Sequence, residues 1–195
     1  MGLLSGKTYI TSLSLFHITV AYFFLTNPMT LVDHSLVWVI GESMGMPEEP
    51  SLESHSPALA FLAVILAIMG LTDLLTLNLP EDVCLVDHWG MQAPIRLLIS
   101  LVLLAYTFIF SPSSPVYRDT TPARGRLAHP DASIHNPGYV PSGWGGDGLK
   151  NRVFFAFMFI EMAAWFGLWI TLREERSEIV ARNARKRGLQ PQDLM

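Results

Sequence analysis

Four apolar stretches in this chain are long enough, or nearly long enough, to cross a lipid bilayer. They cover about residues 8–26, 58–79, 95–110 and 153–172, and a helix of about 20 residues spans the hydrocarbon core. Only 15% of the residues are charged and the mean hydropathy is +0.35, whereas soluble domains carry about 25% charged residues. Because backbone groups in lipid must bond within a helix or a closed barrel, we predict an all-α membrane protein, a bundle of four transmembrane helices.

A shorter apolar run, LVWVI (residues 36–40), follows the first predicted span. It is flanked by Asp33, His34 and Glu42, and it is too short to cross a bilayer alone. We therefore predict a short interfacial or re-entrant helix at this position.

The composition changes between residues 111 and 150, which include six prolines and six glycines. Such a stretch without apolar periodicity predicts a long irregular loop, and the sequence leaves open whether a partner orders it. Residues 1–176 are expected to form the membrane domain. Residues 177–195, which have mixed charge and a basic end, are expected to form a solvated cytosolic tail.

Tryptophan and proline suggest where the last two spans begin and end. Trp165 and Trp169 lie in the second half of the fourth span, and Trp89 precedes the third, so all three are expected in the headgroup region. Pro94 suits the first turn of a helix. The third span is therefore expected to begin near residue 95, after a short connector, CLVDHWGMQAP (residues 84–94).

The basic residues predict which way the bundle faces. With four spans, both termini and the loop between the second and third spans lie on one side, and that side holds eight of the 13 Lys and Arg residues. The other five lie in the long loop or at its end. By the positive-inside rule, both termini are predicted to be cytosolic and the long loop lumenal or external.

Composition and motifs exclude several functions. A net charge of -4 provides no basic surface for nucleic acid, and Cys84, the single cysteine, cannot form an intramolecular disulfide or a cysteine zinc cluster. The chain lacks the phosphate-binding, zinc-protease and nucleophile-elbow motifs. No cofactor is expected, because His129, Asp131 and His135 in the long loop would need further ligands to hold a metal.

Four ionisable residues lie within or at the edge of the predicted spans: His17, Asp73, Arg96 and Glu161. A charged group near the bilayer centre costs at least about 2.5–3.5 kcal/mol, so each needs a partner, water or a proton. Asp73 and Arg96 are expected at similar depth, as an ion pair. Glu161 is expected either to be protonated or to meet His17. For both pairs we favour a structural role over a ligand or proton path.

The second span also carries small residues at helical spacing. Ala63, Ala67 and Gly70 form a stripe that suits close helix packing, and Asp73 lies one turn further on nearly the same face. Asp73 is therefore expected to point into the bundle and away from lipid.

Four segments together carry a family resemblance: LFHITVAYFFLTNPMTL, LAVILAIMGLTDLLTL, QAPIRLLISLVLLAYTFIF and FIEMAAWFGLWITLREER. In order and spacing they resemble the fungal increased-loss-of-mitochondrial-DNA protein family of small endoplasmic reticulum membrane proteins. The loop of residues 111–150 is longer than the family's connector. The resemblance implies an endoplasmic reticulum location and an indirect requirement for mitochondrial DNA maintenance, and it implies no catalytic residue.

Three functions are consistent with these features. The first is a non-enzymatic accessory or scaffold protein whose bundle and long loop dock onto a larger membrane-protein complex. The second is a lipid- or sterol-binding protein, or an isomerase-like enzyme, in which His17, Asp73 and Glu161 line a cavity. The third is a small ion-conducting protein. Acids that converge on one cavity would favour the second, and acids packed against helices the first.

Overall fold

The computed structural model describes residues 5–48, 50–52, 55–80, 82–111, 114 and 144–186. Within these residues the chain forms helices and no strands, which confirms the all-α prediction. The elements are α1 (Gly6–Thr26), α2 (Met29–Val32), α3 (Ser35–Ser43), η1 (Pro50–Leu52), α4 (Pro57–Thr76), the π-helix η2 (Asp82–His88), α5 (Trp89–Ile109), η6 (Gly145–Leu149) and α6 (Arg152–Lys186).

Four of these helices are long and apolar enough to cross a membrane: α1, α4, η2 together with α5, and α6. Helices α1 and α4 each begin at a serine N-cap. The side chain of Ser5 accepts a hydrogen bond from the Thr8 amide at the start of α1, and that of Ser56 accepts one from the Leu59 amide at the start of α4. The prediction of four helices that can span a membrane is confirmed, as in a multi-pass membrane protein.

Helix α6 is longer than a bilayer is thick. Its 35 residues correspond to about 50 Å of helix, against about 30 Å of hydrocarbon. The charged segment that begins at Arg173 continues the helix without a break at residue 176. The last turns of α6, beyond Ile179, therefore extend past the apolar core of the bundle.

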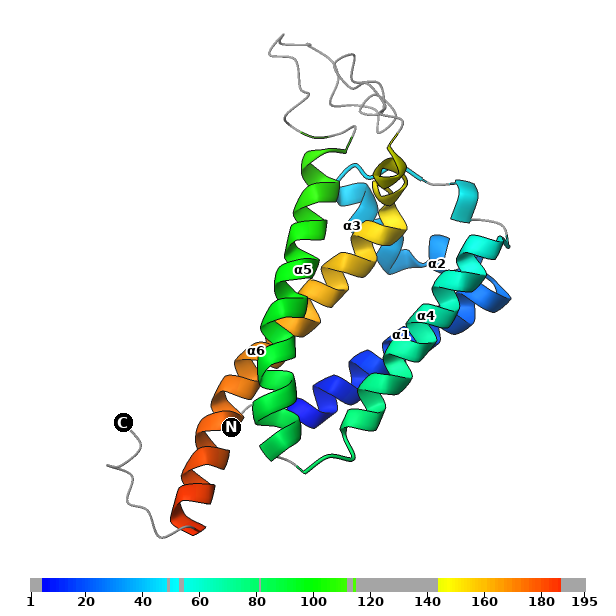
Figure 1. The fold of residues 1–195 in the computed structure, drawn as a ribbon. Helices are drawn as coiled ribbons and strands as arrows, with labels where there is room; N and C mark the ends of the chain where they lie inside the picture. The colour runs from blue at the N-terminus through cyan, green and yellow to red at the C-terminus, as the bar shows by residue number, and fades with distance from the viewer. Residues whose placement is uncertain are drawn as a thin grey trace, which may run out of the picture.

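The long helices are arranged as two pairs (Figure 1). Helix α1 packs along α4, and α5 packs along α6. Near the N-terminus the pairs are in contact: the amide of Gly6 donates a hydrogen bond of 2.9 Å to Oε1 of Glu175. Toward the other end of the bundle they diverge, and α2 and α3 lie in the opening.

Arg152 links α3, and the residues that follow it, to α6. The guanidinium of Arg152 donates to Glu42 at 3.2 Å and to Glu48 at 2.7 Å, and the carbonyl of Met46 accepts from its Nε at 3.4 Å. The structure thus has a nine-residue helix where the short helix was predicted. Its interfacial position stays a prediction.

The start of the third span differs from the prediction. Residues 84–94 form no connector: η2 and the first turns of α5 make this segment helical, so α5 begins at Trp89 and Pro94 lies inside it. Cys84, Leu85 and Trp89 are buried in a core cluster with α1 and α6. Their packing holds this segment in the bundle, whereas Pro94 alone suggested a helix start.

Most of the predicted long loop lies outside the described residues, including His129, Asp131 and His135. Its last part is described, and there residues Gly145–Leu149 form the short helix η6 before α6 begins.

Candidate functional site

Asp73 and Arg96 form a two-pronged ion pair between α4 and α5. Nη1 of Arg96 lies 2.7 Å from Oδ2 of Asp73, and Nη2 lies 3.0 Å from Oδ1. The Asp73 residue is 4% exposed, so it points into the bundle. Because a planar guanidinium matches a carboxylate in this geometry, the pairing predicted from the sequence is confirmed.

Two stacked tryptophans complete the surroundings of Arg96. Its guanidinium carbon lies 5.2 Å from the ring centre of Trp89 and 4.9 Å from that of Trp165, within the range of cation–π attraction. The two rings lie 5.6 Å apart and nearly parallel. Nε1 of Trp89 also donates to Oγ1 of Thr76 on α4, at 2.9 Å. Arg96 is therefore held by α4, α5 and α6 together.

His17 and Glu161 form the second buried pair, between α1 and α6. Nε2 of His17 lies 2.6 Å from Oε1 of Glu161, and Nε1 of Trp165 donates to Oε2 of Glu161 at 2.6 Å. His17 is fully buried, and its Nδ1 has no hydrogen-bond partner among the described residues. A buried N–H without a partner is rare. The hydrogen-bond balance therefore favours a proton on Nε2 of His17, donated to Glu161.

Trp165 joins the two pairs. Its indole N–H binds Glu161, while its ring face lies against Arg96. The sequence identified the four ionisable residues and treated Trp89 and Trp165 as residues of the headgroup region, without predicting that both are buried between helices. A useful signal was the spacing of four between Glu161 and Trp165, which puts them on one face of a helix. We call the resulting cluster the buried polar network, and it connects all four spans. Its members are His17, Asp73, Arg96, Glu161, Trp89 and Trp165.

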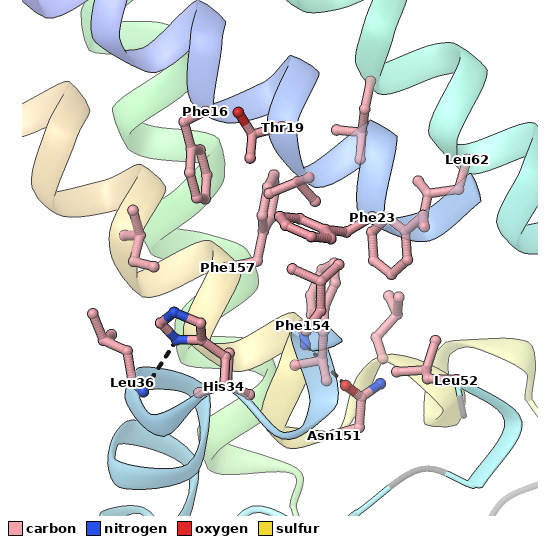
Figure 2. A pocket seen from close by; sticks show the side chains of 18 of the residues that line it. Phe16, Thr19, Phe23, His34, Leu36, Leu52, Leu62, Asn151, Phe154 and Phe157 are labelled. Atoms are coloured by element: carbon pink, nitrogen blue, oxygen red, sulfur yellow. Dashed lines mark hydrogen bonds between the residues drawn. The ribbon is translucent and has the colours of Figure 1, made fainter. Parts of the chain in front are cut away.

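A separate cavity of about 440 Å³ lies where the helix pairs diverge (Figure 2). Its walls come from α1, α4, the α2–α3 segment and the start of α6, and they include Phe16, Phe23, Leu62, Phe154 and Phe157. None of the described lining residues carries a carboxylate, ammonium or guanidinium group. Asp73, Arg96 and Glu161 are not among them.

Phe16 and Phe157 separate the cavity from the buried polar network. Their rings stack at 5.7 Å, and the Phe157 ring lies 6.1 Å from the imidazole of His17. Each ring also lines the cavity. The acids are thus enclosed by helices and aromatic rings, and the cavity presents an apolar surface. Among the described residues no three His, Cys, Asp or Glu side chains are grouped to hold a metal.

Comparison with known proteins gives one match. No curated protein and no solved structure matches the chain. The model of the family described as increased loss of mitochondrial DNA protein 1 matches residues 4–182. That range contains all four spans and every residue of the buried polar network. The chain therefore belongs to the increased loss of mitochondrial DNA protein 1 family.

Proposed function

We propose that this protein is a non-enzymatic accessory or scaffold subunit of a larger membrane-protein complex in the endoplasmic reticulum, and that mitochondrial DNA maintenance requires it indirectly. Family membership fits a protein linked to mitochondrial DNA maintenance. One observation supports the scaffold role most directly. The ionisable members of the buried polar network bind one another and the two tryptophans, Trp89 and Trp165. They do not converge on the cavity.

A catalytic group has to reach its substrate, with space beside it for the reacting atom. Both carboxylate oxygens of Asp73 are bound by Arg96, and both of Glu161 are bound by His17 and Trp165. Each acid therefore already has a partner at both oxygens. This arrangement favours a structural role over isomerase-like chemistry, and the apolar walls of the cavity give no support to an ion path.

The charged C-terminal part of α6, from Arg173 on, is a suitable contact for a partner. It carries both signs of charge, and Arg176, Glu178 and Arg185 are exposed. A helix that projects about 20 Å beyond the hydrocarbon can reach a neighbouring subunit outside the bilayer.

Purification of the tagged protein from its native membranes in a mild detergent tests the scaffold role. We expect a membrane-protein partner in stoichiometric amount. We also expect Arg176→Glu with Arg185→Glu to release that partner, whereas Lys7→Glu, an exposed charge reversal at the start of α1, retains it. A protein that purifies alone under these conditions would contradict the proposal.

A second experiment separates a scaffold from an enzyme. If Glu161 only holds helices together, mitochondrial DNA content in cells carrying Glu161→Gln should follow the amount of folded protein. Restoring that amount by higher expression should then restore the DNA. Loss of the DNA at normal levels of folded Glu161→Gln protein would favour a chemical role for this carboxylate.

A further inference from the structure

The apolar cavity has a direction relative to the membrane. Its outer end lies where α6 begins, beside Asn151 and His34 (Figure 2). Next to it, Arg152 binds Glu42 and Glu48, a group of charges that belongs in water or among lipid headgroups. Its inner end is formed by Phe16 and Phe157, beside the buried polar network. The cavity therefore runs from the interface toward the middle of the bilayer.

The depth of the cavity corresponds to most of one leaflet. The lining residues of α6 extend from Val153 to Ile160, and those of α1 from Phe16 to Phe24. At 1.5 Å per residue, both stretches are about 10–12 Å long, while half of the hydrocarbon core is about 15 Å.

We propose that this cavity holds one acyl chain of a glycerophospholipid, with its headgroup at the end of the cavity near Asn151. This inference concerns the cavity alone and does not depend on the scaffold role. Water is disfavoured in a cavity with apolar walls, so a hydrocarbon occupant is the favourable one. The volume of about 440 Å³ lies within the range of about 300–1,000 Å³ that is usual for ligand sites.

The way the cavity opens favours a lipid as the occupant. Access from the bilayer is available, because Leu36 and Leu62 line the cavity and are 46% and 40% exposed. An acyl chain can thus enter sideways, between α3 and α4, from the surrounding lipid.

The test uses the full-length protein in nanodiscs that contain phosphatidylcholine with a photoactivatable diazirine on one acyl chain. After irradiation, mass spectrometry should find the lipid attached mainly to peptides that contain residues 16–24 and 153–160. Val153→Phe fills the cavity from α6, and Thr19→Phe fills it from α1. Because added bulk in a filled site excludes the chain, either variant should reduce this labelling on the order of tenfold.

Val102→Phe is the matched control, since Val102 is 57% exposed on the outer face of α5 and the added atoms are the same as in Val153→Phe. This control should leave cavity labelling unchanged. Monodisperse elution of each variant shows that it is folded. The proposal fails if folded Val153→Phe and Thr19→Phe label like the control, or if labels lie only on outer helix faces. It also fails if a photoactivatable sterol labels the cavity peptides and phosphatidylcholine does not.

Discussion

At the scale of single residues, Trp165 has two separate functions in the buried polar network. Its N–H satisfies one oxygen of Glu161, and its ring covers the guanidinium of Arg96. Phenylalanine at this position would keep an aromatic face but would lack the N–H. Glu161 would then have His17 as its remaining partner within the network.

Trp165→Phe is therefore expected to lower the free energy of unfolding by about 1.5–3 kcal/mol, the range for a hydrogen bond to a charged group. The measurement is the thermal unfolding midpoint in detergent. Trp38→Phe is the control, because Trp38 is 53% exposed. Equal midpoints for the two variants would show that the Glu161 contact contributes little.

The Asp73–Arg96 pair allows a second test. Asp73→Asn removes the carboxylate charge and leaves the Arg96 cation without its ionic partner, whereas Asp73→Ala combined with Arg96→Ala removes both charges. Leaving one partner of a buried pair alone is the more costly change. We expect less folded, monodisperse protein from the single variant than from the double variant. Equal yields from both would contradict an ion pair that matters for folding.

The sequence identified His17, Asp73, Arg96 and Glu161 because a polar group in an apolar span is costly and must find a partner. It did not identify the tryptophans. Tryptophan has an apolar body and one polar atom, so it suits both the headgroup region and a buried hydrogen-bonded position. Only the partners, Thr76 and Glu161, distinguish these two environments.

At the scale of helices, α1 and α4 approach each other closely at Gly70. A Cβ atom on Gly70 would lie 2.7 Å from the carbonyl oxygen of Ser14 and 2.8 Å from Cγ1 of Ile18. Since the first of these atoms is backbone, the two helices would have to move apart. The small-residue stripe predicted from the sequence therefore marks a real close approach.

Gly70→Ala is expected to destabilise the protein by about 1–3 kcal/mol, the usual range for overpacking. Gly90→Ala makes the same chemical change on α5, where the nearest atom to a new Cβ is 3.5 Å away. Alanine is the better helix former by about 1 kcal/mol, so this control should be unchanged or more stable. The thermal midpoint of Gly70→Ala should thus fall, while that of Gly90→Ala should stay the same or rise. A stabilised Gly70→Ala would contradict the close approach.

Hydropathy predicted the helices well, because length and apolar content alone decide which segments can span a bilayer. It failed at the start of α5, where Pro94 and polar residues suggested a connector. That segment is helical because Cys84, Leu85 and Trp89 pack against residues of α1 and α6 that are far away in the sequence. Contacts of this kind have no local signal.

At the scale of the whole molecule, the two helix pairs and the cavity between them could not be predicted from the sequence. The spans have apolar residues on all sides, so their patterns do not say which helices are neighbours. The structure places the first residues of α1, the end of α4 and the middle of α6 at the same end of the bundle. This arrangement agrees with the sides of the membrane that were assigned to the loops.

The charge distribution gives the last prediction, which concerns orientation. Eight of the 13 basic residues belong to the end that holds both termini, so that end is expected in the cytosol. The chain has no Asn-x-Ser/Thr sequence of its own. Any N-glycosylation of a variant would therefore come from the acceptor that was added. An acceptor placed within residues 116–140 should be glycosylated in the endoplasmic reticulum, and one added after Met195 should not. Glycosylation only at the C-terminal acceptor would mean that the opposite orientation is adopted. The outer end of the cavity, near Asn151, would then face the cytosolic leaflet instead of the lumenal one.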